Sequence, residues 1–553
     1  MIPVVSIAIW AVVFLLGWRV SRIGRRPQGY PPGPPTLPIL GNLHQIPTRD
    51  QHEQFTKWAK QYGPIYSLIM GTKTLIVLNN DQVVKDLLDK RSAIYSDRMD
   101  MYTTGEIASG GLRMLAMMRK MNHALLNVNV AKSYVSSPHH VPQLVALTRP
   151  QVPYQDLENK QMLVDLLETP DALLQHVRRY SSSLVASIVF GWRTPSYDNA
   201  KLNQFYTAFG EFVTLAQTAG AALPDFYPLL RKLPTILQPR IQQARRLHVA
   251  EKELYLGNWL AAKRAVAAGT ANPCFCVDMA RRQAKPADED GGFSDELAAY
   301  MAGTLFEAGS DTTSSTLYGF VQGALLYPAC QRRAQAELDA VVGLERLPDL
   351  DDVPRLPYVT ACVKESMRWM PTAALGAAPH AVIQDDEYLG YRIPKGAGVM
   401  MNIWAIHRDE KRYERPEEFW PDRFDGDAVG IAESASLADV RKRDQFGFGA
   451  GRRICQGMHV AERSLLLGIA RLMWGFNITP AIDKATGKPK LPEQDKLVGG
   501  LVVLPDKYEA CIKPRSERHA EMMRAAWAES KKQLDEETGQ WNKIPASMSL
   551  PRL

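Results

Sequence analysis

A single cysteine lies in the glycine-rich segment Phe448-Gly-Ala-Gly-Arg-Arg-Ile-Cys-Gln-Gly457, directly before the apolar stretch 458–476. The glycines let the backbone pass close to a flat cofactor, because they carry no Cβ. Cys455 begins the predicted helix, where free N–H groups and the positive end of the helix dipole favour a thiolate. Arg453 adds a cation two residues earlier. The segment therefore predicts a fold that presents one cysteine sulfur to a flat cofactor.

Two other interpretations of this segment are open. A lone cysteine in a glycine turn is usually an inert buried thiol, and Gly449-x-Gly451 could belong to a phosphate loop. No Walker lysine or acidic partner follows to support the phosphate loop. The remaining cysteines form no CxxC pair, so they predict neither a disulfide framework nor a zinc site. They are Cys274, Cys276, Cys330, Cys362 and Cys511.

The chain begins with an uncharged, almost wholly apolar run at residues 2–18. As a helix this run would span about 25 Å. Four arginines follow between residues 19 and 26. By the positive-inside rule they predict a transmembrane anchor in the endoplasmic reticulum membrane, with the body of the protein in the cytosol. A cleaved signal peptide is the alternative, but it would carry its positive charge before the apolar run.

Residues 19–42 form a basic and proline-rich hinge, which we expect to be stiff because proline fixes φ and removes a backbone donor. Residues 43–515 show no further shift in composition and are predicted to form one large domain. It is mainly α with small β-sheets. A tail at 516–553 contains one more predicted helix, 517–536. Helices are expected at 51–61, 81–90, 158–167, 171–190, 202–218, 239–268 and 294–326, a hairpin at 65–78, and short strands near 377–396 and 497–512.

The spacing Phe-x-x-Gly-x-Arg-x-Cys-x-Gly resembles the signature of the cytochrome P450 family. Other segments resemble the microsomal type over nearly the whole chain, and most of all the filamentous-fungal members that oxidise secondary metabolites. The resemblance implies haem b, with Cys455 as the axial ligand of the iron and Phe448 and Gly449 in the loop against the cofactor. It also implies that Arg453 and His380, the latter in Pro379-His380, bind haem propionates.

The predicted helix 294–326 contains Ala308-Gly309-Ser310-Asp311-Thr312-Thr313. Acids and alcohols are unusual inside a helix, because their side chains compete for backbone hydrogen bonds. The resemblance implies that dioxygen lies beside Ala308 and Gly309. Thr312 would then hold the bound oxygen by a hydrogen bond, and Asp311 would relay protons. A polar helix bend without catalytic meaning is the alternative.

Glu365 and Arg368 are spaced to share one helix face, which alone is a common surface pair. Together with Arg423 in the downstream segment Phe419-Trp-Pro-Asp-Arg-Phe424, they resemble the buried Glu-Arg-Arg cluster of the family. The resemblance implies a structural role for this cluster, which fixes the loop that presents Cys455.

Two regions depart from the family. The family's Trp-Arg-x-x-Arg helix is matched only by residues 115–123, in which Arg119 alone remains to bind a propionate, and the junction at 117–118 is abrupt. Residues 135–151 are proline-rich and have no counterpart in the family's run of helices. We hypothesise a retained intron at 135–151 and an over-trimmed exon near 117. A genuine loop insertion is the alternative.

Net charge and the segments around the site predict the partners. The excess of 66 basic over 59 acidic residues gives +7, which suits a membrane surface or an acidic protein but is too weak for nucleic acid. Arg441-Lys-Arg443 and Arg452 offer a basic face to an NADPH–cytochrome reductase. Small and apolar segments predicted to face the pocket, among them 372–378, favour a bulky hydrophobic substrate.

The sequence thus predicts a haem-dependent monooxygenase that inserts one oxygen atom from O2 into a hydrophobic organic substrate. Electrons would come from NADPH through the reductase. Two alternatives remain: a haem-thiolate isomerase or dehydratase that uses no oxygen, and a non-catalytic, haem-deficient product of a mis-spliced gene. The intact Asp311-Thr312 pair disfavours the isomerase alternative. The changed region around Arg119 leaves the haem-deficient product as an alternative.

Overall fold

The computed structural model describes residues 20–113, 152–284 except 218, and 292–545 except 543, with five scattered positions before residue 20. The expected anchor at 2–18 falls almost entirely outside the described residues. Arg119, the 117–118 junction and residues 135–151 fall wholly outside them. Within the described part of the chain, no helix combines the length and apolar character needed to cross a membrane.

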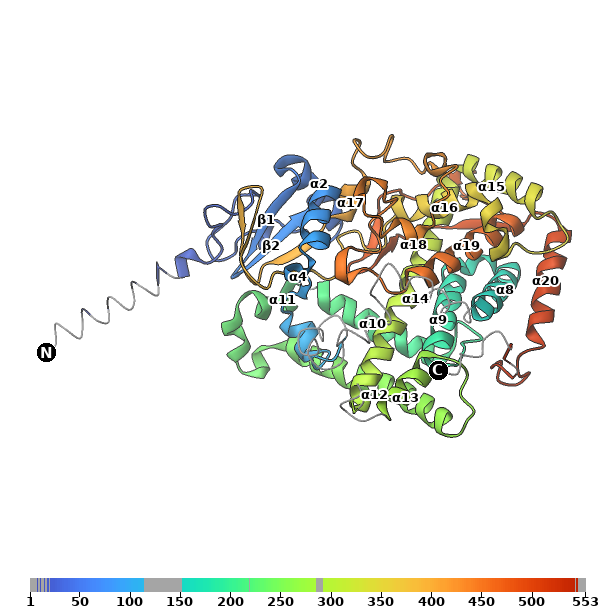
Figure 1. Ribbon diagram of the computed structural model, residues 1–553, viewed down its shortest axis with the longest axis horizontal. Coiled ribbons are helices and arrows are strands. Elements are labelled where there is room, and N and C mark those ends of the chain that lie inside the picture. The colour runs from blue at the N-terminus through green and yellow to red at the C-terminus, as the bar shows by residue number, and fades with distance from the viewer. Residues whose placement is uncertain are drawn as a thin grey trace.

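The long helix α14 (Asp295–Leu326) runs through the middle of the molecule (Figure 1). Its first turn is stabilised by the Ser294 side chain, which accepts a hydrogen bond from the Leu297 amide, and by two acidic residues near the positive end of the dipole. Most of its side chains are buried, because α9 (Leu173–Phe190), α12 (Pro239–Ala267) and α19 (Met458–Gly475) pack against it. This helix therefore forms the centre of the hydrophobic core.

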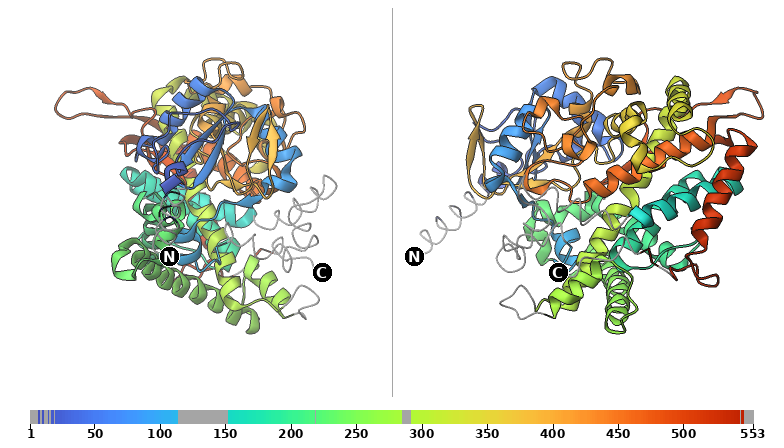
Figure 2. Two further views of the ribbon diagram at one scale, coloured as in Figure 1. Left: turned by 90° about the vertical axis from the view of Figure 1, so that its left-hand side faces the viewer. Right: turned by 45° about the vertical axis from the view of Figure 1, so that its right-hand side comes forward.

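The other long helices surround this centre. They are α2 (Gln51–Tyr62), α8 (Val152–Glu168), α10 (Ala200–Gln217), α11 (Ala219–Phe226), α13 (Phe275–Gln283), α15 (Pro328–Val341), α16 (Pro357–Trp369) and α20 (Glu517–Lys531). Figure 2 shows α20, in red, alongside α8, in teal, and the two helices are in contact. The C-terminal tail is thus packed onto the helical body, at least through α20.

The main sheet lies at the end of the molecule where the N-terminal segment enters (Figure 1). Its strand order is β1-β2-β7-β4-β3, in which β3 (Asp97–Arg98) and β4 (His380–Ala381) are two-residue strands. The hairpin of β1 (Ile65–Met70) and β2 (Lys73–Leu78) is antiparallel, and β2 runs parallel to β7 (Gly398–Met401). Three smaller sheets are formed by β5 (Asp386–Tyr388) with β6 (Tyr391–Ile393), β10 (Leu497–Gly499) with β11 (Val503–Pro505), and β8 (Phe476–Ile482) with β9 (Pro489–Lys490) and β12 (Ala510–Pro514). The predicted class, mainly α with small sheets, is confirmed.

Candidate haem-thiolate site

The cysteine loop is held by its own backbone. The Cys455 amide donates to the Phe448 carbonyl at 2.8 Å, and the Gly449 amide donates to the Phe446 carbonyl at 2.8 Å. Gly449 has φ +82°, a left-handed conformation that glycine adopts without strain. The loop leads into α19 through Gly457. These bonds fix the direction in which the loop presents Cys455.

A second set of contacts joins the loop to the segment η2 (Lys85–Lys90). A Cβ on Gly451, which has φ +63°, would lie 1.9 Å from the Leu88 carbonyl oxygen, so only glycine fits this approach. The Gly451 amide donates to Asp89 at 2.8 Å, and Asp89 also pairs with Arg443 at 2.6 Å. Gly451 thus brings two segments of the protein together.

The Cys455 side chain is exposed, as are Gln456 and Gly457, whereas Phe448 at the start of the loop is buried. Burial of the surroundings raises the pKa of the Cys455 thiol and outweighs the lowering effect of the Gly457 amide. The helix α19 begins at Met458, so Cys455 lies before the first turn and not within it, as the sequence had suggested.

Three basic side chains gather beside the loop. β3 (Asp97–Arg98) pairs with β4 (His380–Ala381), so that Arg98 and His380 are direct cross-strand neighbours. The Arg453 charge acts on both Arg98 and His380, and the Arg98 charge acts on His380. Burial and the Arg453 charge lower the pKa of Arg98 to about 10, and burial and the Arg98 charge lower the pKa of His380 to about 3. Both pKa values are lowered because too little negative charge surrounds these groups to stabilise their cationic forms.

The hydrogen bonds within this cluster leave a donor and positive charge available for an anionic ligand. The Arg453 Nε donates to the Ser96 carbonyl at 2.6 Å, and the His380 Nδ1 faces the Tyr95 carbonyl at 2.8 Å. The Arg98 Nη1 donates to the Ala378 carbonyl, whereas the Arg98 Nε is buried without a hydrogen-bond partner. Buried cations are normally paired. A cofactor that carries carboxylates, as haem does, fits the chemistry of this cluster.

Arg98 is a site residue that the sequence did not identify. It lies in a two-residue strand, and its partner His380 is far along the chain. Nothing local to Asp97-Arg98 signals a ligand. Arg453 and His380, which the sequence did single out, are brought together by the structure, whereas Arg119 lies outside the described residues.

The middle of α14 presents an accessible patch in an otherwise buried helix. Ala308 is exposed and Thr312 is half-buried, while their neighbours in the helix are largely enclosed. The Thr312 hydroxyl donates to the Ala308 carbonyl at 2.8 Å. Asp311 is buried and lies 3.5 Å from Arg178 of α9. Burial raises the pKa of the Asp311 carboxyl, an effect that the Arg178 charge only partly offsets. Asp311 therefore keeps a proton to higher pH than an ordinary aspartate.

The structure brings the three predicted members of the charge cluster together. Glu365 accepts from Arg368 Nε at 2.7 Å and Nη2 at 2.8 Å, and from Arg423 Nε at 3.1 Å. Glu365 and Arg368 are fully buried. The Arg368 Nη1 donates to the carbonyls of His407 and Pro416, each at 2.8 Å. The cluster thus links α16 to the segment that leads toward the cysteine loop.

The predicted basic docking face needs one correction. Arg443 is buried and paired with Asp89, so it cannot meet a partner protein. Its guanidinium closes the contact between the cysteine loop and η2, for which a long cation with a fork of donors is suited. Arg441, Lys442 and Arg452 are exposed.

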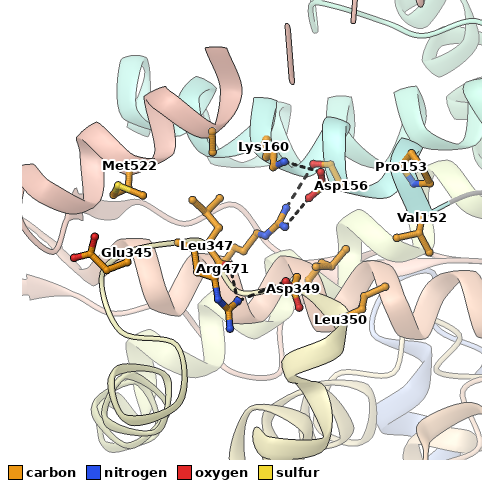
Figure 3. A pocket seen from close by; sticks show the side chains of 13 residues that line it. Val152, Pro153, Asp156, Lys160, Glu345, Leu347, Asp349, Leu350, Arg471 and Met522 are labelled. Atoms are coloured by element: carbon orange, nitrogen blue, oxygen red, sulfur yellow. Dashed lines mark hydrogen bonds and ion pairs between the residues drawn. The ribbon is translucent and has the colours of Figure 1, made fainter. Parts of the chain in front are cut away.

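A surface cleft of about 550 Å³ lies between α8, α19, α20 and the loop around Leu347 (Figure 3). Across it, Arg471 pairs with Asp156 at 2.6 Å, and Asp156 also pairs with Lys160 at 2.7 Å. None of the predicted site residues lines this cleft. Its polar walls already satisfy one another, so it is separate from the site at Cys455.

A sequence model of the cytochrome P450 family matches residues 31–512. The chain is 46% identical over 551 residues to the cytochrome P450 monooxygenase virE of Hypocrea virens, covering 97% of this chain and 96% of that protein. It is 45% identical to the cytochrome P450 monooxygenase fogE of Aspergillus ruber, with 96% and 95% covered. It is 44% identical to the cytochrome P450 monooxygenase fsoB of Humicola fuscoatra, with 98% and 97% covered.

Proposed function

Because the chain belongs to the cytochrome P450 family and is a monooxygenase, we propose that it inserts one oxygen atom from O2 into a bulky hydrophobic secondary metabolite. Electrons would come from NADPH through a flavoprotein reductase. The observation that carries this proposal is the juxtaposition on one loop of an accessible Cys455 sulfur and the Arg453 cation, beside Arg98, whose Nε lacks a hydrogen-bond partner.

Haem b fits these residues, with Cys455 as the iron ligand and Arg98, Arg453 and His380 as the partners of its propionates. Bound there, it supplies the activation of dioxygen, which a thiolate ligand favours by donating electron density. The Arg98 Nε would gain the acceptor that it lacks. A carboxylate beside His380 would also reverse the effect of the two arginines and raise the pKa of its imidazole.

Asp311 and Thr312 would handle the protons of the reaction. Asp311 is buried, which raises the pKa of its carboxyl, and it lies 3.5 Å from the Arg178 guanidinium. The Thr312 hydroxyl is accessible and is held by the Ala308 carbonyl one turn earlier. A buried acid next to an oriented alcohol is suited to proton delivery. The isomerase alternative requires neither group and is not favoured.

The membrane association of the protein is supported by an exposed apolar surface. Leu229, Ile236 and Leu237 are 79%, 82% and 64% exposed. They lie in the short helices η6 (Pro228–Lys232) and η7 (Thr235–Leu237) after α11. This region touches the proline-rich hinge, since the Tyr227 hydroxyl donates to the Ile39 carbonyl at 2.9 Å. Together with the predicted anchor at 2–18, this surface would seat the protein on the endoplasmic reticulum membrane.

The electron donor would approach the face that carries Arg441, Lys442 and Arg452. These side chains are exposed close to the cysteine loop. A cationic face steers an acidic protein toward it. The hydrophobic nature of the substrate is supported by the membrane-facing apolar surface. Its assignment to fungal secondary metabolism is supported by the fungal sources of the three relatives.

The proposed reaction is tested with microsomes that contain the protein and its reductase. They are supplied with NADPH, isotopically labelled O2 and a panel of polyketide, terpenoid and aromatic compounds. We expect one labelled oxygen atom per oxidation in at least one product. Products that form without label, or that form equally in microsomes lacking the protein, would contradict the proposal.

A further inference from the structure

His407 joins the charge cluster to the cysteine loop through its two ring nitrogens. It is the last residue of α17 (Ile403–His407) and is fully buried. Its Nδ1 lies 2.8 Å from the Arg368 carbonyl oxygen. Its Nε2 accepts a hydrogen bond from the Phe446 amide at 2.8 Å. The imidazole thus bridges the main chain of α16 and the main chain of the loop.

The partners of His407 fix its protonation state. A carbonyl oxygen only accepts, so Nδ1 must carry the hydrogen; an amide N–H only donates, so Nε2 must be bare. The ring is therefore the neutral Nδ1–H tautomer. Burial first, and then the Arg368 charge, hold the pKa of His407 well below its ordinary value. The nearby cations Arg408 and Arg412 act in the same direction.

The Phe446 end of this bridge is where the cysteine loop begins. The Phe446 carbonyl accepts the Gly449 amide, and the Phe448 carbonyl accepts the Cys455 amide, each at 2.8 Å. The hydrogen bond from the Phe446 amide to His407 Nε2 therefore holds the start of the loop, and the two backbone hydrogen bonds that follow it hold the loop as far as Cys455. The other fixed point of the loop is the bond from Gly451 to Asp89.

We propose that His407 is a positioning residue, whose Nε2 fixes the start of the cysteine loop and thereby sets how Cys455 ligates the haem iron. The inference rests on the proposed function for the presence of haem. Without the Nε2 acceptor, the Phe446 amide is left buried and unpaired, and the loop must shift to satisfy it. A displaced sulfur is held less firmly against the iron, so a smaller fraction of the protein would carry a thiolate-ligated haem.

Two substitutions separate the bond to the loop from the bond to the cluster. In His407→Gln, the side-chain oxygen reaches the position of Nε2 and can accept from Phe446. In His407→Asn, the shorter amide reaches only the position of Nδ1 and can donate to Arg368. Both variants keep a polar, neutral side chain and lose one of the two bonds. His176→Asn is the control, because His176 is also buried and lies 2.9 Å from a backbone carbonyl, that of Thr169, in a different part of the fold.

The measurement is the absorption spectrum of the reduced, CO-bound holoprotein, in which thiolate and thiol ligands give separate bands. We expect the wild type, His407→Gln and His176→Asn to show mainly the thiolate band. In His407→Asn the ratio of thiolate to thiol should fall about five-fold, the effect of one lost hydrogen bond of ordinary strength. The inference is overturned if the Asn and Gln variants match, whether both keep the band or both lose it equally. If the wild type itself gives no thiolate band, the proposed function fails instead.

Discussion

Removal of the Glu365 carboxylate is the most informative test of the architecture. In Glu365→Gln, the buried Arg368 and the largely buried Arg423 lose the counter-ion that they share. Glu365 accepts two bonds from Arg368 at 2.7 and 2.8 Å, and it also accepts the Trp420 amide at 2.8 Å. A neutral amide keeps the volume but cannot compensate a buried guanidinium. Breaking a buried pair in this way costs about 3–5 kcal/mol.

This loss is large against a typical unfolding free energy of about 5–15 kcal/mol. It should appear as a lower urea midpoint in unfolding followed by circular dichroism, and as earlier loss of the haem absorption. Asp385→Asn is a matched control, because Asp385 pairs with Arg392 at 2.9 Å with both side chains exposed, and its midpoint should not move. If Glu365→Gln unfolds at the same urea concentration as the control, the cluster does not hold the fold together.

Three other changes probe the site itself. Arg98→Met should speed haem loss to excess apomyoglobin about ten-fold, because it removes a charge-assisted bond to a propionate, and an unchanged rate would count against that role. Asp311→Asn should lower product formation about a hundred-fold without altering the CO-bound spectrum. Because the protonated form of Asp311 delivers the proton, wild-type turnover should fall as the pH rises through its raised pKa, and the variant should not show this fall. Arg441→Glu should slow reduction by the reductase at low salt and less so at high salt, with substrate affinity unchanged; equal reduction rates in stopped-flow would refute the docking face.

The parts of the site that depend on neighbouring residues were predictable from the sequence. The order of residues around Cys455 indicated its loop, and the helical pattern of residues 294–326, which contain Asp311 and Thr312, indicated the helix α14. The pairing of Glu365 with Arg368 also follows from helical spacing. These features are local, so short-range patterns determine them.

The parts that depend on tertiary packing were not predictable. Arg98 becomes a candidate for binding the cofactor only because β3 pairs with β4, a contact between segments that are far apart in the sequence. Arg443 looks like one cation in an exposed basic run, and only the approach of η2 shows that it is buried against Asp89. Burial raises the thiol pKa of Cys455 by more than the hydrogen bond of the Gly457 amide lowers it, and burial depends on tertiary packing. His407 showed no signal in sequence, because both of its partners are backbone groups.

The central claim, that Cys455 ligates a haem iron, is tested most directly by comparing the purified wild-type protein with Cys455→Ala. Both are reconstituted with haem, reduced and exposed to CO. We expect a thiolate-type absorption band in the wild type and its complete loss in the variant, while the circular dichroism of the two stays alike. A wild type without that band, or a variant that retains it, would contradict the account.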